Sequence, residues 1–115
     1  MNKIFIATTT FGQYSKEPIN LIRSNNCKID FNEHGRKLSK EEYLNIINKY
    51  DGVIAGTEIY DQDIINKALK LKTISRLGVG IDNVDMEYVK QKSIDVFTTT
   101  TSPALAVSEL TLGLI

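Results

Sequence analysis

Residues 51–80 read DGVIAGTEIYDQDIINKALKLKTISRLGVG, and this stretch decides the fold. It holds two short predicted strands, the apolar run 53–55 and the mixed run 73–77, and a glycine follows each. Between them Asp61 precedes an apolar face, the pattern of a capped helix. We expect four residues of this helix to point inward: Ile64, Ile65, Ala68 and Leu69. Strand, helix and strand in succession indicate a right-handed crossover between parallel strands.

The rest of the chain continues the alternation. Further strands are expected at 3–8, 27–31 and 94–98, bounded by turn-forming residues. Ser15 and Asp85 are suited to cap helices, and Ser39 with Glu42 forms a capping box. The helix after Ser39 carries Tyr43, Ile46, Ile47 and Tyr50 on one face. We therefore predict an α/β, flavodoxin-like, doubly wound parallel five-stranded sheet of order 2-1-3-4-5, with helices on both faces.

Composition excludes several classes of function. The 115 residues include 14 Lys+Arg and 14 Asp+Glu, so the net charge does not favour nucleic acid or an anionic membrane. One cysteine, Cys27, and one histidine, His34, exclude an internal disulfide and the usual Cys/His metal sites. The apolar run Ile4–Ala7 is too short for a signal-peptide core or a membrane span. We expect a cytoplasmic protein.

The segment from about Ala104 to Ile115 is expected to be helical and apolar nearly all round. A helix of this kind is normally buried. We expect Val107, Leu110, Leu114 and Ile115 to be covered by a second copy in a homodimer, or by a further part of a longer protein. The alternative is that the chain is disordered from about Pro103 onward.

Three glycine-containing segments follow predicted strands: 9–12, 56–58 and 78–82. In an open parallel sheet, ligands bind beyond the carboxyl ends of the strands, where the strand order reverses. Glycine and small hydroxyl residues let backbone amides approach an anion closely. Together the segments indicate a small anionic ligand.

The run Gly78-Val79-Gly80 also suggests a dinucleotide fingerprint, G-x-G-x-x-G, but it does not meet the pattern. Asn83 replaces the third glycine, which must be small for the helix to approach the sheet. The nearest downstream acid, Asp95, lies within the next predicted strand rather than at its end.

Three longer strings identify a family resemblance: DGVIAGTE at 51–58, ISRLGVGIDNVD at 74–85 and SELTLGLI at 108–115. In content, order and spacing they resemble the N-terminal substrate-binding domain of the D-isomer-specific 2-hydroxyacid dehydrogenases, in particular the phosphoglycerate-dehydrogenase-like branch. The resemblance covers essentially the whole chain.

The resemblance implies an NAD-dependent oxidoreductase acting on the CH–OH group of a D-2-hydroxy acid similar to 3-phosphoglycerate. It implies a substrate-binding domain at 1–101, and at 102–115 a hinge and the start of a helix leading to an NAD-binding domain. It also implies that the phosphate-binding glycine motif and the catalytic arginine, carboxylate and histidine follow residue 115. This chain alone is then expected to be inactive. The substrate contacts it implies are Ala55, Gly56, Thr57, Gly78, Val79 and Gly80, and Val79 and Val107 are implied to lie near the nicotinamide.

Other polar residues are expected to have structural roles. We interpret Arg76 as a surface cation at a strand end, and His34 as a solvated loop histidine. Cys27 is expected to be a small core residue. The run 82–85 combines a turn with a helix cap.

A free-standing flavodoxin-like module that binds a small ligand is the alternative. The segment Thr8–Gly12 superficially resembles a flavin phosphate loop, although Phe11 stands where a small residue is needed. A phosphoacceptor receiver domain is excluded, because Ala55 and Gly56 occupy the end of the third strand where an aspartate is required.

Overall fold

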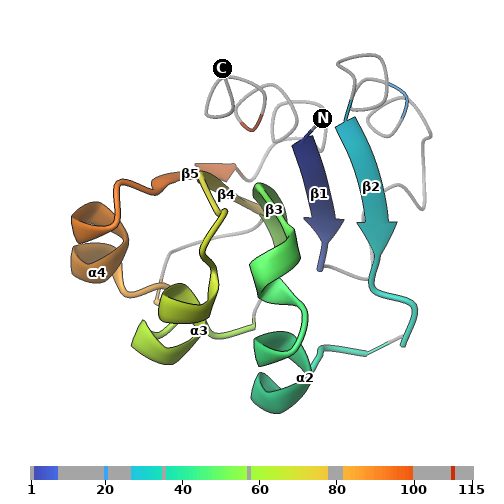
Figure 1. Ribbon diagram of the computed structural model, residues 1–115, viewed down its shortest axis with the longest axis horizontal. Helices are drawn as coiled ribbons and strands as arrows, with labels where there is room; N and C mark the ends of the chain where they lie inside the picture. The colour runs from blue at the N-terminus through green and yellow to red at the C-terminus, as the bar shows by residue number, and fades with distance from the viewer. Residues whose placement is uncertain are drawn as a thin grey trace.

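A central sheet of five strands organises the chain (Figure 1). The computed structural model describes residues 2–7, 20, 27–34, 36–56, 58–77, 82–99 and 110. The strands are β1 (Asn2–Ile6), β2 (Cys27–Phe31), β3 (Gly52–Ala55), β4 (Thr73–Leu77) and β5 (Asp95–Thr99). All neighbouring strands pair in parallel, in the order β2-β1-β3-β4-β5. This confirms the predicted sheet.

The strand order reverses between β1 and β3. Ile4 of β1 pairs with Ile29 of β2 on one side and with Gly52 of β3 on the other. Because all strands run the same way, the segments that follow β3 and β4 emerge at one edge of the sheet. That carboxyl edge is where a ligand is expected in this architecture.

The helices begin at the predicted caps. They are α2 (Lys40–Leu44), the 3₁₀ turn η1 (Ile47–Lys49), α3 (Gln62–Lys67) and α4 (Met86–Gln91). Ser39 accepts the Glu42 backbone N–H at 3.2 Å, and the Glu42 carboxylate accepts the Ser39 N–H at 2.9 Å. Asp61 and Asp85 each accept a backbone N–H at 3.1 Å, from the residue three positions on. The caps predicted at Ser39, Asp61 and Asp85 are confirmed. The turn η1 has no side-chain cap, and the predicted cap Ser15 lies outside the described residues.

Apolar residues are buried on both sides of the sheet. Figure 1 shows α2, α3 and α4 side by side over one face. The core beneath them includes Phe5, Tyr43, Ile47, Val53, Tyr60, Ile64, Ile74 and Val89. The alternate strand residues Ile4, Ile6 and Ile54 are at most 1% exposed and lie outside this cluster, so the other face is buried too. Residues 20 and 110 are helical. Leu110 is only 1% exposed, so burying it requires no second copy.

The predicted helix over 40–50 is interrupted. α2 ends at Leu44, and η1 begins only at Ile47. Asparagine at 45 and β-branched isoleucine at 46 and 47 are weaker helix formers than the residues before them. The tighter turn still buries Ile47 and Tyr50, as the pattern predicted, while Ile46 is only partly buried.

The predicted inward position of Leu69 is wrong, because this side chain is 83% exposed. α3 ends at Lys67, and Ala68 already has non-helical torsion angles (φ −83°, ψ 64°). The helical periodicity therefore no longer applies at position 69. Leu71, at 6% exposure, fills the core position instead.

Candidate functional site

The candidate site lies at the carboxyl edge of β3 and β4. Of the predicted substrate residues, the structure describes Ala55, which ends β3, and Gly56, which follows it, and both are buried. The other predicted ligand contacts lie outside the described residues: 9–12, Thr57, Gly78, Val79, Gly80 and Val107. The structure describes residues on either side of these segments, among them Gly56, Glu58, Arg76 and Asn83.

Both backbone groups of Gly56 are used within the chain. Its N–H donates to Glu58 Oε1 at 2.8 Å, and its carbonyl accepts from Asn83 Nδ2 at 3.0 Å. Gly56 thus contributes its Cα surface rather than an open amide to any ligand at this edge. We expect open amides, if they bind the ligand, to come from the neighbouring glycine segment 78–80.

Asn83 joins the segment after β3 to the segment after β4. Its amide nitrogen also donates to the Glu58 carbonyl at 2.8 Å, and its oxygen accepts from Arg76 Nε at 3.0 Å. Nearby, the Tyr60 N–H donates to the Asn83 carbonyl at 2.7 Å, and Tyr60 forms a parallel bridge with Val84. The structural role predicted for the run 82–85 is supported.

A buried chain of hydroxyl groups ends at the Glu58 carboxylate. Glu58 is 5% exposed, and Tyr60 Oη donates to its Oε1 at 2.7 Å. Tyr43 Oη lies 2.7 Å from Tyr60 Oη. Since the single Tyr60 proton goes to Glu58, Tyr43 must be the donor to Tyr60. Burial is the main cause of a pKa raised well above 10.0 at both tyrosines, so both keep their protons at neutral pH.

These three residues are the part of the site that sequence reasoning missed. The pattern predicted Tyr43 only as an apolar face residue, which its burial confirms, but gave no role to its hydroxyl. The signal in the sequence was the run Glu58-Ile59-Tyr60, which places a carboxylate and a phenol hydroxyl two positions apart, directly before the helix cap Asp61.

Arg76 is not the surface cation that was predicted, because it is only 7% exposed. β4 is an inner strand, and Arg76 pairs with Ala55 of β3 on one side and Thr98 of β5 on the other. An inner strand of a parallel sheet is buried on both faces. The guanidinium is therefore held inside, at the end of β4 where the candidate site begins.

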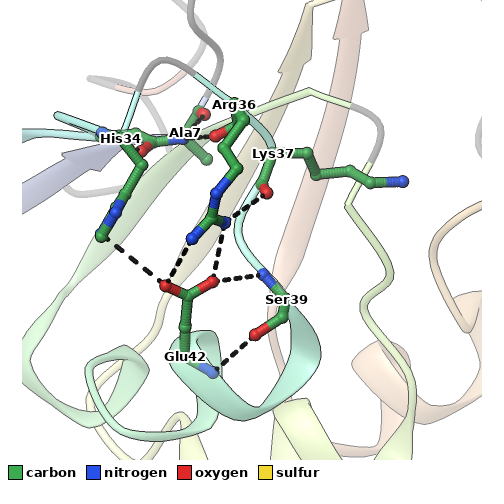
Figure 2. A network of polar contacts seen from close by, with 7 residues as sticks. Ala7, His34, Arg36, Lys37, Ser39 and Glu42 are labelled. Atoms are coloured by element: carbon green, nitrogen blue, oxygen red, sulfur yellow. Dashed lines mark hydrogen bonds and ion pairs between the residues drawn. The ribbon is translucent and has the colours of Figure 1, made fainter.

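The prediction that His34 is a solvated loop residue is confirmed, since its side chain is 51% exposed. Figure 2 shows His34 beside Glu42. The Arg36 guanidinium donates two hydrogen bonds to the Glu42 carboxylate, at 2.8 and 3.0 Å. The His34 Nε2 to Glu42 Oε2 distance is 3.9 Å. The side-chain hydrogen bond from Arg36, aided by the Ser39 N–H, lowers the pKa of Glu42 from 4.5 to about 2. The Glu42 carboxylate therefore has a structural role, as the partner of Arg36 and of the Ser39 N–H.

Cys27 is half-buried at the start of β2 rather than in the core as predicted. Burial is the first cause of a raised pKa of its thiol. A raised pKa lowers the thiolate fraction, which does not favour a nucleophilic role.

Several cavities lie on the α2 side of the sheet, and two of them are lined by residues of the contacts described above. One of about 220 Å³ is lined by Glu58, Tyr43 and Ile59, together with residues 37–40. A second of about 370 Å³ lies farther along α2 and is lined by Phe31, His34 and Tyr50, among others. The smaller cavity adjoins the Glu58 segment, so it belongs to the neighbourhood of the candidate site.

Within the described ranges, no group of three or more His, Cys, Asp or Glu residues could hold a metal ion. No helix among the same residues is long and apolar enough to span a bilayer.

The strand order and the candidate site at the carboxyl edge define an open, flavodoxin-like α/β domain. The family profile of the D-isomer specific 2-hydroxyacid dehydrogenase catalytic domain matches residues 5–112. The chain therefore belongs to the D-isomer-specific 2-hydroxyacid dehydrogenase family. The resemblance inferred from the three sequence strings is confirmed.

Individual relatives agree with this assignment. The chain is 43% identical over 79 residues to the D-3-phosphoglycerate dehydrogenase of Methanocaldococcus jannaschii, covering 67% of this chain and 15% of that protein. It is 39% identical over 82 residues to the human D-3-phosphoglycerate dehydrogenase, covering 70% of this chain and 15% of that protein. The chain thus spans only about 15% of the length of these relatives.

The fold matches a solved structure of 3-phosphoglycerate dehydrogenase from Entamoeba histolytica, in which NAD+ is bound as cofactor. The TM-score is 0.75 at 30% identity, covering 85% of this chain and 32% of that one. A D-lactate dehydrogenase of Salmonella, at 17% identity and a TM-score of 0.66, shares the fold alone.

Proposed function

We propose that this chain is the substrate-binding part of an NAD-dependent oxidoreductase that acts on a D-2-hydroxy acid similar to 3-phosphoglycerate. Residues 1–101 form the substrate-binding domain, and 102–115 form a hinge and the start of a helix leading to an NAD-binding domain. The protein works in the cytoplasm, without nucleic acid or membrane. The observation that carries the proposal is the family match over residues 5–112.

The proposed substrate site combines the segments after β3 and β4. Ala55, Gly56 and Thr57 form one wall, and the amides of Gly78, Val79 and Gly80 bind the substrate carboxylate. The support from the structure is that Gly56 and Asn83, which flank the two segments, are directly hydrogen-bonded at 3.0 Å. This bond holds Gly56 of the proposed wall close to Asn83, which follows Gly80 by three positions in the sequence.

We propose that the segment after β4 is not a site for NAD. In a dinucleotide fold the glycine loop opens a helix whose N-terminus holds the pyrophosphate. Here α4 begins only at Met86, after a turn at 82–83 and the cap Asp85. The Asn83 side chain is tied to Gly56, Glu58 and Arg76, so it cannot act as the small third residue of the fingerprint.

NAD would accept the hydride from the carbon bearing the hydroxyl, and we assign its binding to a domain outside these 115 residues. Val79 and Val107 would lie near the nicotinamide ring of the bound cofactor. The catalytic arginine, carboxylate and histidine of the family are assigned to that other part as well. This chain's own task is to bind and orient the substrate.

Activity and binding of the purified chain test the proposal together. We expect no reduction of NAD with any D-2-hydroxy acid, because hydride transfer requires the cofactor to be held against the substrate. We expect weak binding of D-3-phosphoglycerate and D-glycerate, followed through the backbone amide signals. Turnover by the homogeneous chain would contradict the assignment of catalysis to another domain. If no backbone amide signal shifts when 2-hydroxy or 2-keto acids are added, the proposed substrate site is contradicted.

A further inference from the structure

The segment after β3 is held by a carboxylate that is almost fully buried. Two donors converge on one atom, Glu58 Oε1: the Gly56 N–H at 2.8 Å and the Tyr60 hydroxyl at 2.7 Å. Because a carboxylate loses its hydration on burial, such a group is retained only where hydrogen bonds compensate it. Bonds from neutral donors to a charged acceptor are among the stronger ones in proteins.

The second donor is itself fixed by the core. Tyr60 is 0% exposed and Tyr43 is 1% exposed, and their rings pack edge to face with centroids 5.5 Å apart. Tyr43 belongs to α2, whereas Tyr60 directly precedes the cap of α3. The hydroxyl chain therefore connects the position of Glu58 to two helices that pack on the sheet.

Asn83 holds the same segment from the other side. Its amide donates to the carbonyls of Gly56 and Glu58, and it follows the glycine loop 78–80 by three positions. Gly56 is therefore bonded through its N–H to Glu58 and through its carbonyl to Asn83. A shift of Glu58 would release the Gly56 amide and disturb the connection to the segment after β4.

We propose that Glu58 is a positioning residue of the substrate site. Its carboxylate fixes the backbone of Gly56 and, through Asn83, the distance between the two segments that receive the hydroxy acid. The inference rests on the proposed function for the identity of the ligand. The conformational role itself can be measured without any ligand.

The test compares local amide exchange in the complete 115-residue chain and in three variants. Glu58→Ala removes the acceptor, and Glu58→Gln keeps the shape and one acceptor oxygen without the charge. Leu71→Ala serves as the control, because it destabilises the core from a buried position that is not part of the hydroxyl chain. In each protein the exchange rate of the Gly56 amide is divided by that of the Val53 amide in β3.

We expect Glu58→Ala to raise this ratio by about tenfold or more, the effect of losing one hydrogen bond to a charged group. Glu58→Gln should raise it less. Leu71→Ala should not raise it, because global destabilisation speeds exchange at Val53 at least as much as at Gly56 while the bond to Glu58 is kept. A ratio that stays constant in both Glu58 variants would overturn the proposal. If Glu58→Ala does not fold, the Glu58→Gln ratio decides.

The ligand measurement separates the two claims. If the unmodified chain binds D-3-phosphoglycerate, the affinity should fall about tenfold or more in Glu58→Ala and less in Glu58→Gln. It should stay within about twofold in Leu71→Ala, under conditions where that variant is folded. An equal loss in Leu71→Ala would overturn the positioning role. If the unmodified chain binds no hydroxy acid, the proposed function fails, and the exchange ratio still decides the role of Glu58.

Discussion

The order of donors in the buried hydroxyl chain predicts that two similar substitutions have very different costs. Tyr60→Phe removes the donor to Glu58 Oε1 and also removes the acceptor of the Tyr43 hydroxyl. Losing a hydrogen bond to a charged group costs about 1.5–3 kcal/mol, and leaving a buried hydroxyl unsatisfied costs about 1–3 kcal/mol. The two effects together predict a loss of about 2.5–6 kcal/mol in the free energy of unfolding.

Tyr43→Phe removes only the far end of the chain. Tyr60 still donates to Glu58, and no donor is left without an acceptor, so the expected loss is about 1 kcal/mol. The matched pair deletes the same atom from the same residue type, in side chains that are 0% and 1% exposed. Differences in burial and in ring packing are therefore small.

Urea unfolding of the two variants and the unmodified chain at neutral pH gives the three free energies. Tyr60→Phe should be less stable than Tyr43→Phe by about 1.5 kcal/mol or more. Equal losses in both variants would refute the donor order and show that the Glu58 carboxylate does not depend on Tyr60.

Two further outcomes follow from the burial and charge of particular residues. Leu71→Ala should cost about 2–5 kcal/mol, while Leu69→Ala at an 83% exposed position should change stability by less than about 0.5 kcal/mol, as measured by urea unfolding. A large cost at Leu69 would show that α3 continues past Lys67. A carbon-detected titration should give Glu42 a pKa of about 2, and Arg36→Gln should move that pKa back toward 4.5. Because the folded-state pKa is lowered, the stabilisation from Glu42 is present above about pH 4.5 and is lost as the pH falls toward 2. A Glu42 pKa near 4.5 in the unmodified chain would contradict the ion pair with Arg36.

The sequence predicted those features that depend on local chemistry. Ser39, Asp61 and Asp85 cap helices because a short polar side chain before an apolar periodic run satisfies the free backbone amides. The sheet order followed from the regular alternation of strand and helix. The family could be identified because three motifs occur in the right order.

Features that depend on tertiary contacts could not be predicted in this way. Leu69 continues the apolar pattern of α3, but the helix ends before it and the chain turns outward. The predicted strand order already gave β4 neighbours on both sides, but the bond from Arg76 to Asn83 that holds the guanidinium inside is a tertiary contact that the sequence does not reveal. Likewise, the hydroxyls of Tyr43 and Tyr60 meet only because α2 and the segment after β3 pack together.

The most direct test of the substrate site is a map of amide signal changes when D-3-phosphoglycerate is added to the isotope-labelled chain. The account predicts that the changes concentrate at the carboxyl edge of β3 and β4, at Gly56, Asn83 and the segment 78–80. Gly80→Val should abolish them while the chain remains folded. Changes centred instead on the cavity lined by Phe31, His34 and Tyr50, or an unaltered response in Gly80→Val, would contradict it.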